Sequence, residues 1–218
     1  HETYAHVVGE HFGKTIVGFF TDEPRFGGRV GGAEIPWTPA LPEVFKTRKG
    51  YDLSLGMAVL FDLKASRALG DVKRAQVICD FLDVVTSMWR ENWWELLHVW
   101  CADRGLILTG HLPGEDHLLG HLTNGGEFFR AMDAVDWPGI VVISRQIDAH
   151  TDAKTPNDFP KFASSAAHLH GKNRILSESF AVYGWDLTFD EMRWITNFQY
   201  VRGVNALSPM AFYSDIRG

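Results

Sequence analysis

Short apolar runs alternate with longer stretches of helical periodicity along this 218-residue chain. The short runs are typical of buried strands and lie at residues 15–22, 106–111, 138–143, 174–177 and 204–213. Between them, apolar positions recur with a period near 3.6, which predicts helices, most clearly over 71–104, 162–170 and 187–201. This alternation predicts an α/β fold with five or six parallel strands, in either a doubly wound sheet or a barrel.

Residues 25–56 are rich in glycine and proline, which predicts a long loop with one short helix near 41–49. Long loops after strands commonly shape sites, and we expect this one to contribute no core element. In the helix predicted over 71–104, Asp71 is expected to cap the start and Gly105 to end the last turn.

The distribution of polar residues favours the barrel. Acidic, histidine and aromatic side chains follow several different strands, as the catalytic face of a barrel requires, and no G-x-G-x-x-G sequence follows any strand. A complete (β/α)8 barrel of the TIM type has eight strands in about 250 residues. Because the chain opens in a helix, we expect residues 1–218 to form one incomplete barrel domain, with about the fourth to eighth βα units. Its open sheet edges would favour self-association.

Composition and charge exclude several classes of partner. The net charge is −6 and basic residues form no stripe, which argues against nucleic acid and acidic membrane surfaces. No apolar segment reaches the roughly 18 residues of a membrane-spanning helix, and the first residues do not follow the order of a signal peptide.

Cys79 and Cys101 are about 33 Å apart on one predicted helix, too far for a disulfide. The thiols do not decide the compartment, and a secreted or periplasmic bacterial protein is one hypothesis.

Two glutamates stand at the carboxyl ends of predicted strands. Glu23 follows the strand at 15–22 and Glu178 follows the strand at 174–177, with two further strands between them. In an eight-stranded barrel this spacing places the two carboxyl groups on facing sides of the mouth. Hydrolysis of a glycosidic bond uses such a pair, one to protonate the leaving oxygen and one to attack or to activate water. Glu178 taken alone is equally compatible with a partly buried glutamate satisfied by hydroxyls or an arginine.

Four further residues are predicted to bind substrate. His111 ends the strand at 106–111, where it can bond a sugar hydroxyl or orient a carboxylate. Asp22 would point away from Glu23 if the strand stayed regular, so it is either a structural acceptor or a site residue. Trp185 and Tyr213 lie near the predicted mouth and can stack on a pyranose face or serve packing. The eight tryptophans and fifteen phenylalanines exceed what a core of this size needs, so some should line a site.

Six short motifs together carry a family resemblance: FTDEP at 20–24, WREN at 89–92, LTGH at 108–111, SESF at 177–180, GWDLTF at 184–189 and SPMAFY at 208–213. In this order they resemble bacterial glycoside hydrolases of the α-L-rhamnosidase type, glycoside hydrolase family 106. The resemblance extends over most of the chain from Thr15 onward. It implies a (β/α)8 catalytic barrel, usually flanked by β-rich accessory domains and often dependent on calcium.

The resemblance also assigns roles to the two glutamates. Glu23, on the fourth strand, would be the general acid, and Glu178, on the seventh, the base or nucleophile. Rhamnosidases of this type are expected to invert configuration, which makes Glu178 a base acting through water, whereas a retaining relative would use it as a nucleophile. The partner is then a carbohydrate substrate, and the chemistry requires no cofactor or catalytic metal. Calcium on some of Asp22, Glu115 and Asp116 is compatible with this hypothesis.

Two other classes of function compete with the glycosidase. One is a metal-dependent hydrolase that uses the cluster His111, His117 and His121 together with Glu115 and Asp116, although the spacing H-x5-H-x3-H matches no compact metal-binding signature. The other is a non-catalytic, carbohydrate-binding barrel fragment. The position and direction of the Glu23 and Glu178 side chains distinguish the paired-acid hypothesis from the metal site.

Overall fold

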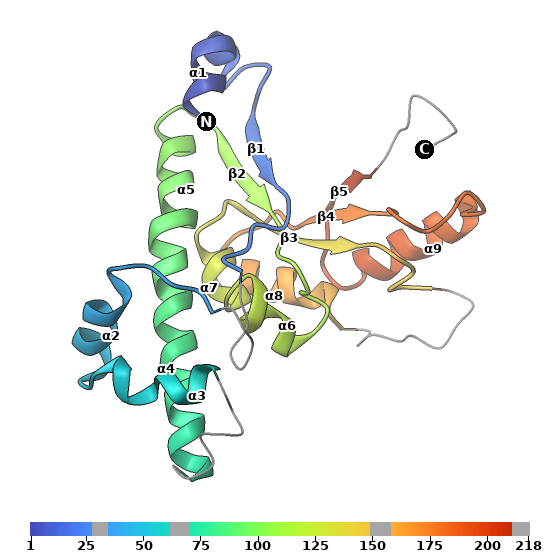
Figure 1. Ribbon diagram of the computed structural model, residues 1–218. Coiled ribbons are helices and arrows are strands. Elements are labelled where there is room, and N and C mark those ends of the chain that lie inside the picture. The colour runs from blue at the N-terminus through green and yellow to red at the C-terminus, as the bar shows by residue number, and fades with distance from the viewer. Residues whose placement is uncertain (28–34, 62–69, 149–157, 211–218) are drawn as a thin grey trace.

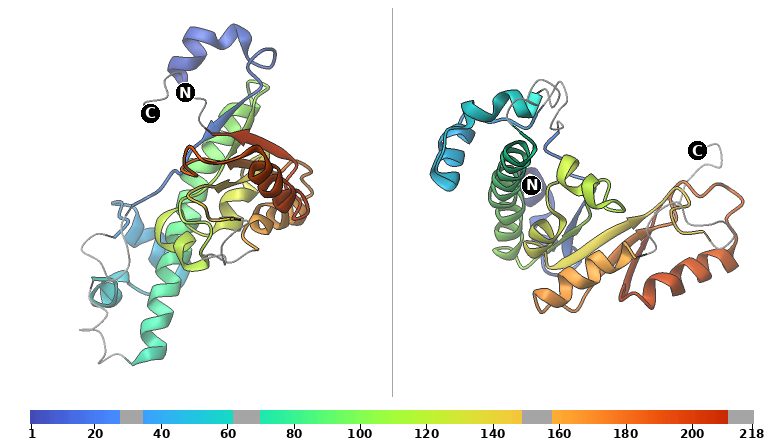
Figure 2. Two further views of the ribbon diagram at one scale, coloured as in Figure 1. Left: turned by 90° about the vertical axis from the view of Figure 1, so that its right-hand side faces the viewer. Right: turned by 90° about the horizontal axis from the view of Figure 1, so that it is seen from below.

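Five parallel strands form the centre of the computed structural model, which describes residues 1–27, 35–61, 70–148 and 158–210. The strands are β1 (Gly18–Thr21), β2 (Ile107–Gly110), β3 (Trp137–Val142), β4 (Leu176–Ser179) and β5 (Ala206–Pro209). Their order in the sheet is their order in the sequence, and each neighbouring pair is parallel. A doubly wound sheet reverses its strand order at a switch point, and this sheet does not. The α/β prediction is confirmed, and the sheet curls as part of a barrel does (Figures 1 and 2).

Helices follow or precede each strand, as the periodicity predicts. The helical elements are α1 (Glu2–Val8), η1 (Gly9–His11), α2 (Leu41–Lys49), η2 (Leu53–Gly56), α3 (Met57–Phe61), α4 (Asp71–Trp89), the π-helical η4 (Arg90–Trp94), α5 (Glu95–Ala102), α6 (Leu118–Asn124), α7 (Phe128–Asp133), α8 (Pro160–Leu169) and α9 (Phe189–Tyr200). The helix predicted over 71–104 is α4, η4 and α5 in succession. Asp71 does not cap it: Gly70 is the N-cap residue, and the Asp71 carboxylate instead pairs with Arg74 at 3.0 Å. The short helix α6 was not predicted.

The main hydrophobic core lies between the sheet and its helices. Leu108 of β2 and Ile140 and Val142 of β3 are fully buried in it, together with Trp94 and Phe128. Successive strand residues point to opposite faces, so these side chains leave the other face of the sheet for polar residues. Trp94, which lies in η4 of the long helix, is one of the largest side chains of this core.

A second core lies outside the sheet, between α2, η2, α3 and α4. Leu41, Phe45 and Leu53 are at most 1% exposed there and pack with Phe81 and Val84 of α4. The prediction that residues 25–56 contribute no core element is therefore wrong. The apolar positions at Leu41 and Phe45 are one helical turn apart, and this single pair is easily overlooked in a segment rich in glycine and proline.

The described residues include both cysteines. Cys79 is exposed on α4 and Cys101 is buried on α5, and both are free thiols. Among the helices that the structure describes, none is both long enough and apolar enough to cross a membrane.

Gly110 allows the ends of β1 and β2 to approach closely. A Cβ atom at this position would lie 2.2 Å from the carbonyl oxygen of Thr21, and the backbone φ is +153°. Thr21 also accepts a hydrogen bond from the backbone N–H of His111 at 3.4 Å. The residues that follow the two strands, Asp22 and His111, are thereby placed side by side.

We expect Gly110→Ala to lower the free energy of unfolding by at least about 2 kcal/mol, because the added methyl group collides with backbone that cannot turn away. Chemical denaturation of the purified protein measures this. Gly9→Ala is the matched control, since a Cβ atom there meets no atom within 4 Å. Equal stability of the two variants would show that the close approach at Gly110 does not constrain the sheet.

Candidate active site

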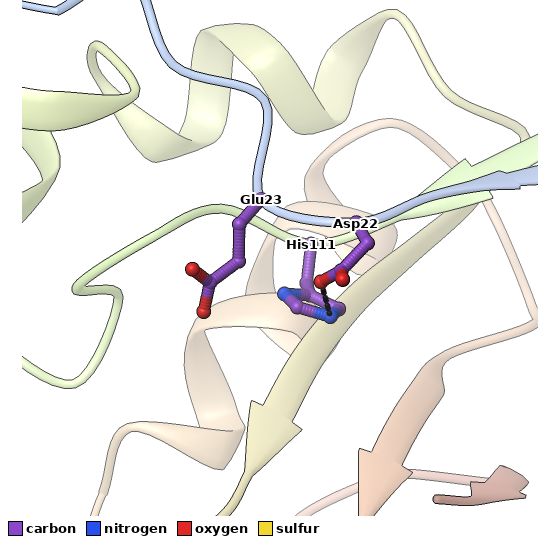
Figure 3. A group of neighbouring side chains, drawn as sticks. All are labelled: Asp22, Glu23 and His111. Atoms are coloured by element: carbon purple, nitrogen blue, oxygen red, sulfur yellow. Dashed lines mark ion pairs between the residues drawn. The ribbon is translucent and has the colours of Figure 1, made fainter.

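Four polar side chains from three strands meet at the carboxyl ends of the sheet. Asp22 and Glu23 follow β1, His111 follows β2, and Glu178 lies in β4. One side-chain atom each of Asp22, Glu23 and His111 lies within 4.8 Å of the other two (Figure 3). Glu178 joins this group through His111, whose Nε2 is 2.7 Å from Glu178 Oε2.

The backbone of Glu23 explains why two consecutive carboxylates share one site. Strand β1 ends at Thr21, and Glu23 has a φ of +41°, in the left-handed region that non-glycine residues rarely adopt. The side-chain alternation of a regular strand is lost here, so Asp22 does not point to the opposite face as a regular strand would require. Strained residues of this kind cluster at functional sites.

Glu178 faces the interior of the curled sheet, opposite the helices. Its neighbours Ser177 and Ser179 are fully buried, their hydroxyl groups are 2.8 Å apart, and Ser179 also bonds Gln199 of α9. Because residues alternate along a strand, Glu178 must point away from α9. Its side chain is only 13% exposed, and its partner is the imidazole of His111. The alternative of a glutamate satisfied by hydroxyls or an arginine does not describe this contact.

His111 is 1% exposed and holds Glu178 through one ring nitrogen. The same Nε2 lies 3.4 Å from Asp22 Oδ1, whereas Nδ1 is buried without a hydrogen-bond partner in the part of the chain that the structure describes. A proton on Nδ1 would be a buried, unpaired donor, so we assign to Nε2 the proton that is donated to Glu178. With so little exposed surface, the ring is placed to orient a carboxylate rather than to bond a sugar hydroxyl.

His111 also limits the distance between the two glutamates. An oxygen of Glu23 lies within 4.8 Å of a ring nitrogen, and Glu178 Oε2 lies 2.7 Å from Nε2. Together these contacts keep an oxygen of Glu23 and an oxygen of Glu178 within about 10 Å, a limit that includes the carboxyl separations of retaining and inverting glycosidases. Glu23 is partly exposed, and Arg25 lies 3.7 Å from its carboxylate.

Glu115 is a buried acid that the sequence suggested only as a metal ligand. It accepts hydrogen bonds from the backbone N–H of Leu112, at 3.1 Å, and of Val141 in β3. Burial raises the pKa of its carboxyl well above the usual value, and the negative charge of Glu23 adds to this, whereas the two backbone bonds oppose it. Glu115 thus fastens the loop that follows His111 to β3.

The three histidines of the alternative metal site are not brought together. His121 directs its Nε2 to the backbone oxygen of Glu115, at 2.6 Å, and burial lowers the pKa of its ring. His117 is exposed beside Asp116. Among the described residues, the one group of three or more potential ligands is Asp22, Glu23 and His111.

Two further residues, Trp185 and Tyr213, were predicted to bind substrate. Trp185 is 72% exposed on the loop after β4. Tyr213 lies outside the described residues, so its predicted role stays a prediction.

A calcium ion takes six to eight oxygen ligands, so a calcium site needs carboxylates with free and accessible oxygens. Glu115 does not fit, because both of its oxygens already accept backbone hydrogen bonds in a buried position. The carboxylates of Asp22 and Glu23 fit, since they are close together and accessible. His111 supplies nitrogen, which is not a typical calcium ligand.

A curled parallel sheet with acidic residues at its strand ends is the arrangement of a barrel-type hydrolase. The family model of glycoside hydrolase family 106, alpha-L-rhamnosidase, matches residues 2–210 of the chain. The chain therefore belongs to this family, which confirms the resemblance carried by the six motifs.

One solved structure that resembles the chain is that of a rhamnosidase from Novosphingobium sp. PP1Y. The TM-score is 0.69 with 19% sequence identity, over 94% of this chain and 18% of that one. At this identity the likeness shows the shared fold. The present chain spans about a fifth of the length of that protein. A comparison with curated proteins gave no match.

The raised pKa of Glu115 predicts a specific dependence of stability on pH. The folded carboxyl holds its proton more tightly than the unfolded one, whose pKa is about 4.3, so this group stabilises the fold below that pH. As the pH rises through the folded pKa, the free energy of unfolding of the wild-type protein should fall relative to Glu115→Gln, by up to about 1.4 kcal/mol per pH unit.

Urea denaturation at a series of pH values measures this difference. The exposed Glu10→Gln is the control and should follow the wild-type curve. A pH dependence left unchanged by Glu115→Gln would show that Glu115 does not titrate differently in the folded protein.

Proposed function

We propose that this chain is part of the catalytic domain of an α-L-rhamnosidase, a glycoside hydrolase that uses Glu23 and Glu178 on a carbohydrate substrate. The observation that carries the proposal is the contact between His111 and Glu178, because it unites acidic residues from β1 and β4 in one site. Family membership over residues 2–210 supports the same activity.

Glu23 serves as the general acid in this mechanism. Its carboxyl group gives a proton to the glycosidic oxygen as the bond from that oxygen to the anomeric carbon breaks. The side chain is partly exposed, so a leaving group can approach it from solvent. Its position in the group with Asp22 and His111 holds it beside the reacting centre.

Glu178 serves as the base. The Nε2–H of His111 donates to its Oε2, which fixes the carboxylate as an acceptor. It takes a proton from water while the water oxygen bonds to the anomeric carbon, and the configuration inverts. Inversion follows the expectation for the family; attack by Glu178 itself would give retention.

We extend the proposal to the architecture. The five strands β1–β5 correspond to the fourth to eighth strands of a (β/α)8 barrel, within a single catalytic domain over residues 1–218. Among the described residues, β1 and β5 each pair with one neighbouring strand, so each has an open edge. Such edges favour pairing with another chain, and we propose self-association through them.

Calcium is retained as a proposal for the same site. Asp22 would hold the ion through its carboxylate oxygens, and water or substrate hydroxyls would complete its coordination. Glu23 would stay off the ion, because a carboxylate bound to calcium cannot carry the proton that a general acid donates. A bound calcium ion would supply charge to orient sugar hydroxyls. The acid and base roles of Glu23 and Glu178 do not require it.

Glu23→Gln and Glu178→Gln should each lower kcat on methyl α-L-rhamnoside by about 10²-fold or more, since each removes a proton-transfer group while keeping its shape and the methoxide leaving group requires a proton. Proton NMR of the released sugar measures the rate, and the first sugar formed shows the configuration. Glu10→Gln, far outside the cluster on η1, should retain wild-type activity. Unchanged activity in both active-site variants would remove the paired-acid mechanism.

His111→Phe should lower kcat by about 10²-fold with little change in KM, because Glu178 loses the donor that positions it. His111→Gln, which keeps an N–H donor, should recover part of the loss. Steady-state kinetics separate kcat from KM, and thermal unfolding shows whether each variant is folded. Equal kinetic losses for the two variants would show that the N–H donor of His111 does not position Glu178.

A further inference from the structure

A pocket of about 390 Å³ lies on the β1 side of the site, between the segment that follows Glu23 and the helices α2 and α4. We call it the Trp37 pocket. It is lined by Phe26, Pro36, Trp37, Thr38, Ala40, Leu41, Val85, Met88, Trp89 and Asn92. Its volume is within the usual range for small-molecule sites. None of the acid–base residues lines it, so its ligand is not the reacting sugar ring itself.

The lining of the Trp37 pocket is aromatic and aliphatic. Trp37 is 51% exposed, although it is a large apolar side chain, and Phe26 meets Trp89 edge to face with ring centroids 5.9 Å apart. None of the described residues that line the pocket carries a charge. A ligand that covers the exposed face of Trp37 would remove apolar surface from water and gain ring contacts.

The position of the pocket relative to Glu23 defines which part of a substrate reaches it. Phe26 is three residues after Glu23, so the two Cα atoms are at most about 11 Å apart. A general acid protonates the oxygen of the leaving group, and the leaving group therefore lies on its side of the reacting bond. Glu178 comes from β4, whereas the pocket is built by the chain between β1 and β2 (Figure 1).

The polar groups of the pocket distinguish an aromatic ring from a second sugar. A sugar ring carries several hydroxyl groups, each of which loses its water on binding and requires a partner. Among the described lining residues, polar side-chain groups belong to Thr38, Asn92 and the indoles of Trp37 and Trp89. The Asn92 amide already donates to the carbonyl oxygen of Met88 at 2.8 Å, and the Trp89 Nε1–H is buried, so few groups are left for sugar hydroxyls. A planar aromatic group has few polar atoms that require a hydrogen-bond partner.

We propose that the Trp37 pocket binds an aromatic leaving group, the aglycone of an aryl glycoside. This inference rests on the proposed function, in which Glu23 is the acid. It assigns the specificity for the leaving group to the segment between β1 and β2, apart from the residues that carry out the reaction.

Two measurements test the proposal. The first is binding of free 4-methylumbelliferone by equilibrium dialysis, which requires no catalysis. Trp37→Ala should weaken this binding about tenfold, as expected for the loss of a stacking ring. Trp194→Ala is the matched control, because Trp194 is similarly exposed but lies on α9, and it should bind as the wild-type protein does.

The second measurement compares two substrates with the same sugar, 4-methylumbelliferyl and methyl α-L-rhamnoside. Trp37→Ala should lower kcat/KM about tenfold for the aryl substrate and less than about twofold for the methyl substrate. Equal losses for the two substrates, or no binding of 4-methylumbelliferone, would overturn the assignment of the pocket. Binding that depends on Trp37 in a protein that hydrolyses neither substrate would support the aromatic ligand and overturn the glycosidase function instead.

Discussion

The contact between His111 and Glu178 is the interaction on which the site depends. Strands β2 and β4 are separated by β3, so in a flat sheet their axes would be about 10 Å apart. Side chains that point to the concave face of a curled sheet converge, and the two residues meet at 2.7 Å. Each also offsets the cost of burying the other, because an imidazole with 1% exposure and a carboxylate with 13% exposure would both be unfavourable without a partner. The contact exists only if the curl, the strand order and the β2 end at Gly110 are all in place.

Glu115 supports the contact between His111 and Glu178 by holding the backbone near His111 in place. A buried carboxylate is costly, and burial raises the pKa of this one. Its carboxylate accepts hydrogen bonds from two backbone N–H groups, those of Leu112 next to His111 and of Val141 in β3, the strand between β2 and β4. Glu115 thus holds in place the backbone that carries His111, whereas Glu178, the proposed base, is the carboxylate that His111 contacts.

The sequence alone predicts the strands and the chemistry of their ends, because both depend on local patterns. Apolar runs mark β1 to β5, and the rule that ligands meet the carboxyl ends of parallel strands selects Glu23, His111 and Glu178. Features that depend on residues far apart in the sequence were not predicted. The core at Leu41 and Phe45 needs α4 to cover it, the role of Glu115 needs the N–H of Val141, and the direction of Asp22 follows from the positive φ of Glu23. None of these is encoded by the spacing of residues along the chain.

The second core gives the segment between β1 and β2 its own stability. Phe45, Phe81 and Val84 are buried among themselves and belong to a cluster separate from the core beneath the sheet. Trp37 lines a pocket that this cluster borders through Leu41, so Trp37 can change without disturbing the strands that hold Glu23 and Glu178. Under the proposed function, catalysis rests on strand ends that tolerate little variation, since Gly110 permits no side chain, while recognition of the leaving group rests on the residues of the Trp37 pocket, which tolerate more. This separation would allow one catalytic arrangement to serve substrates that differ in the group being released.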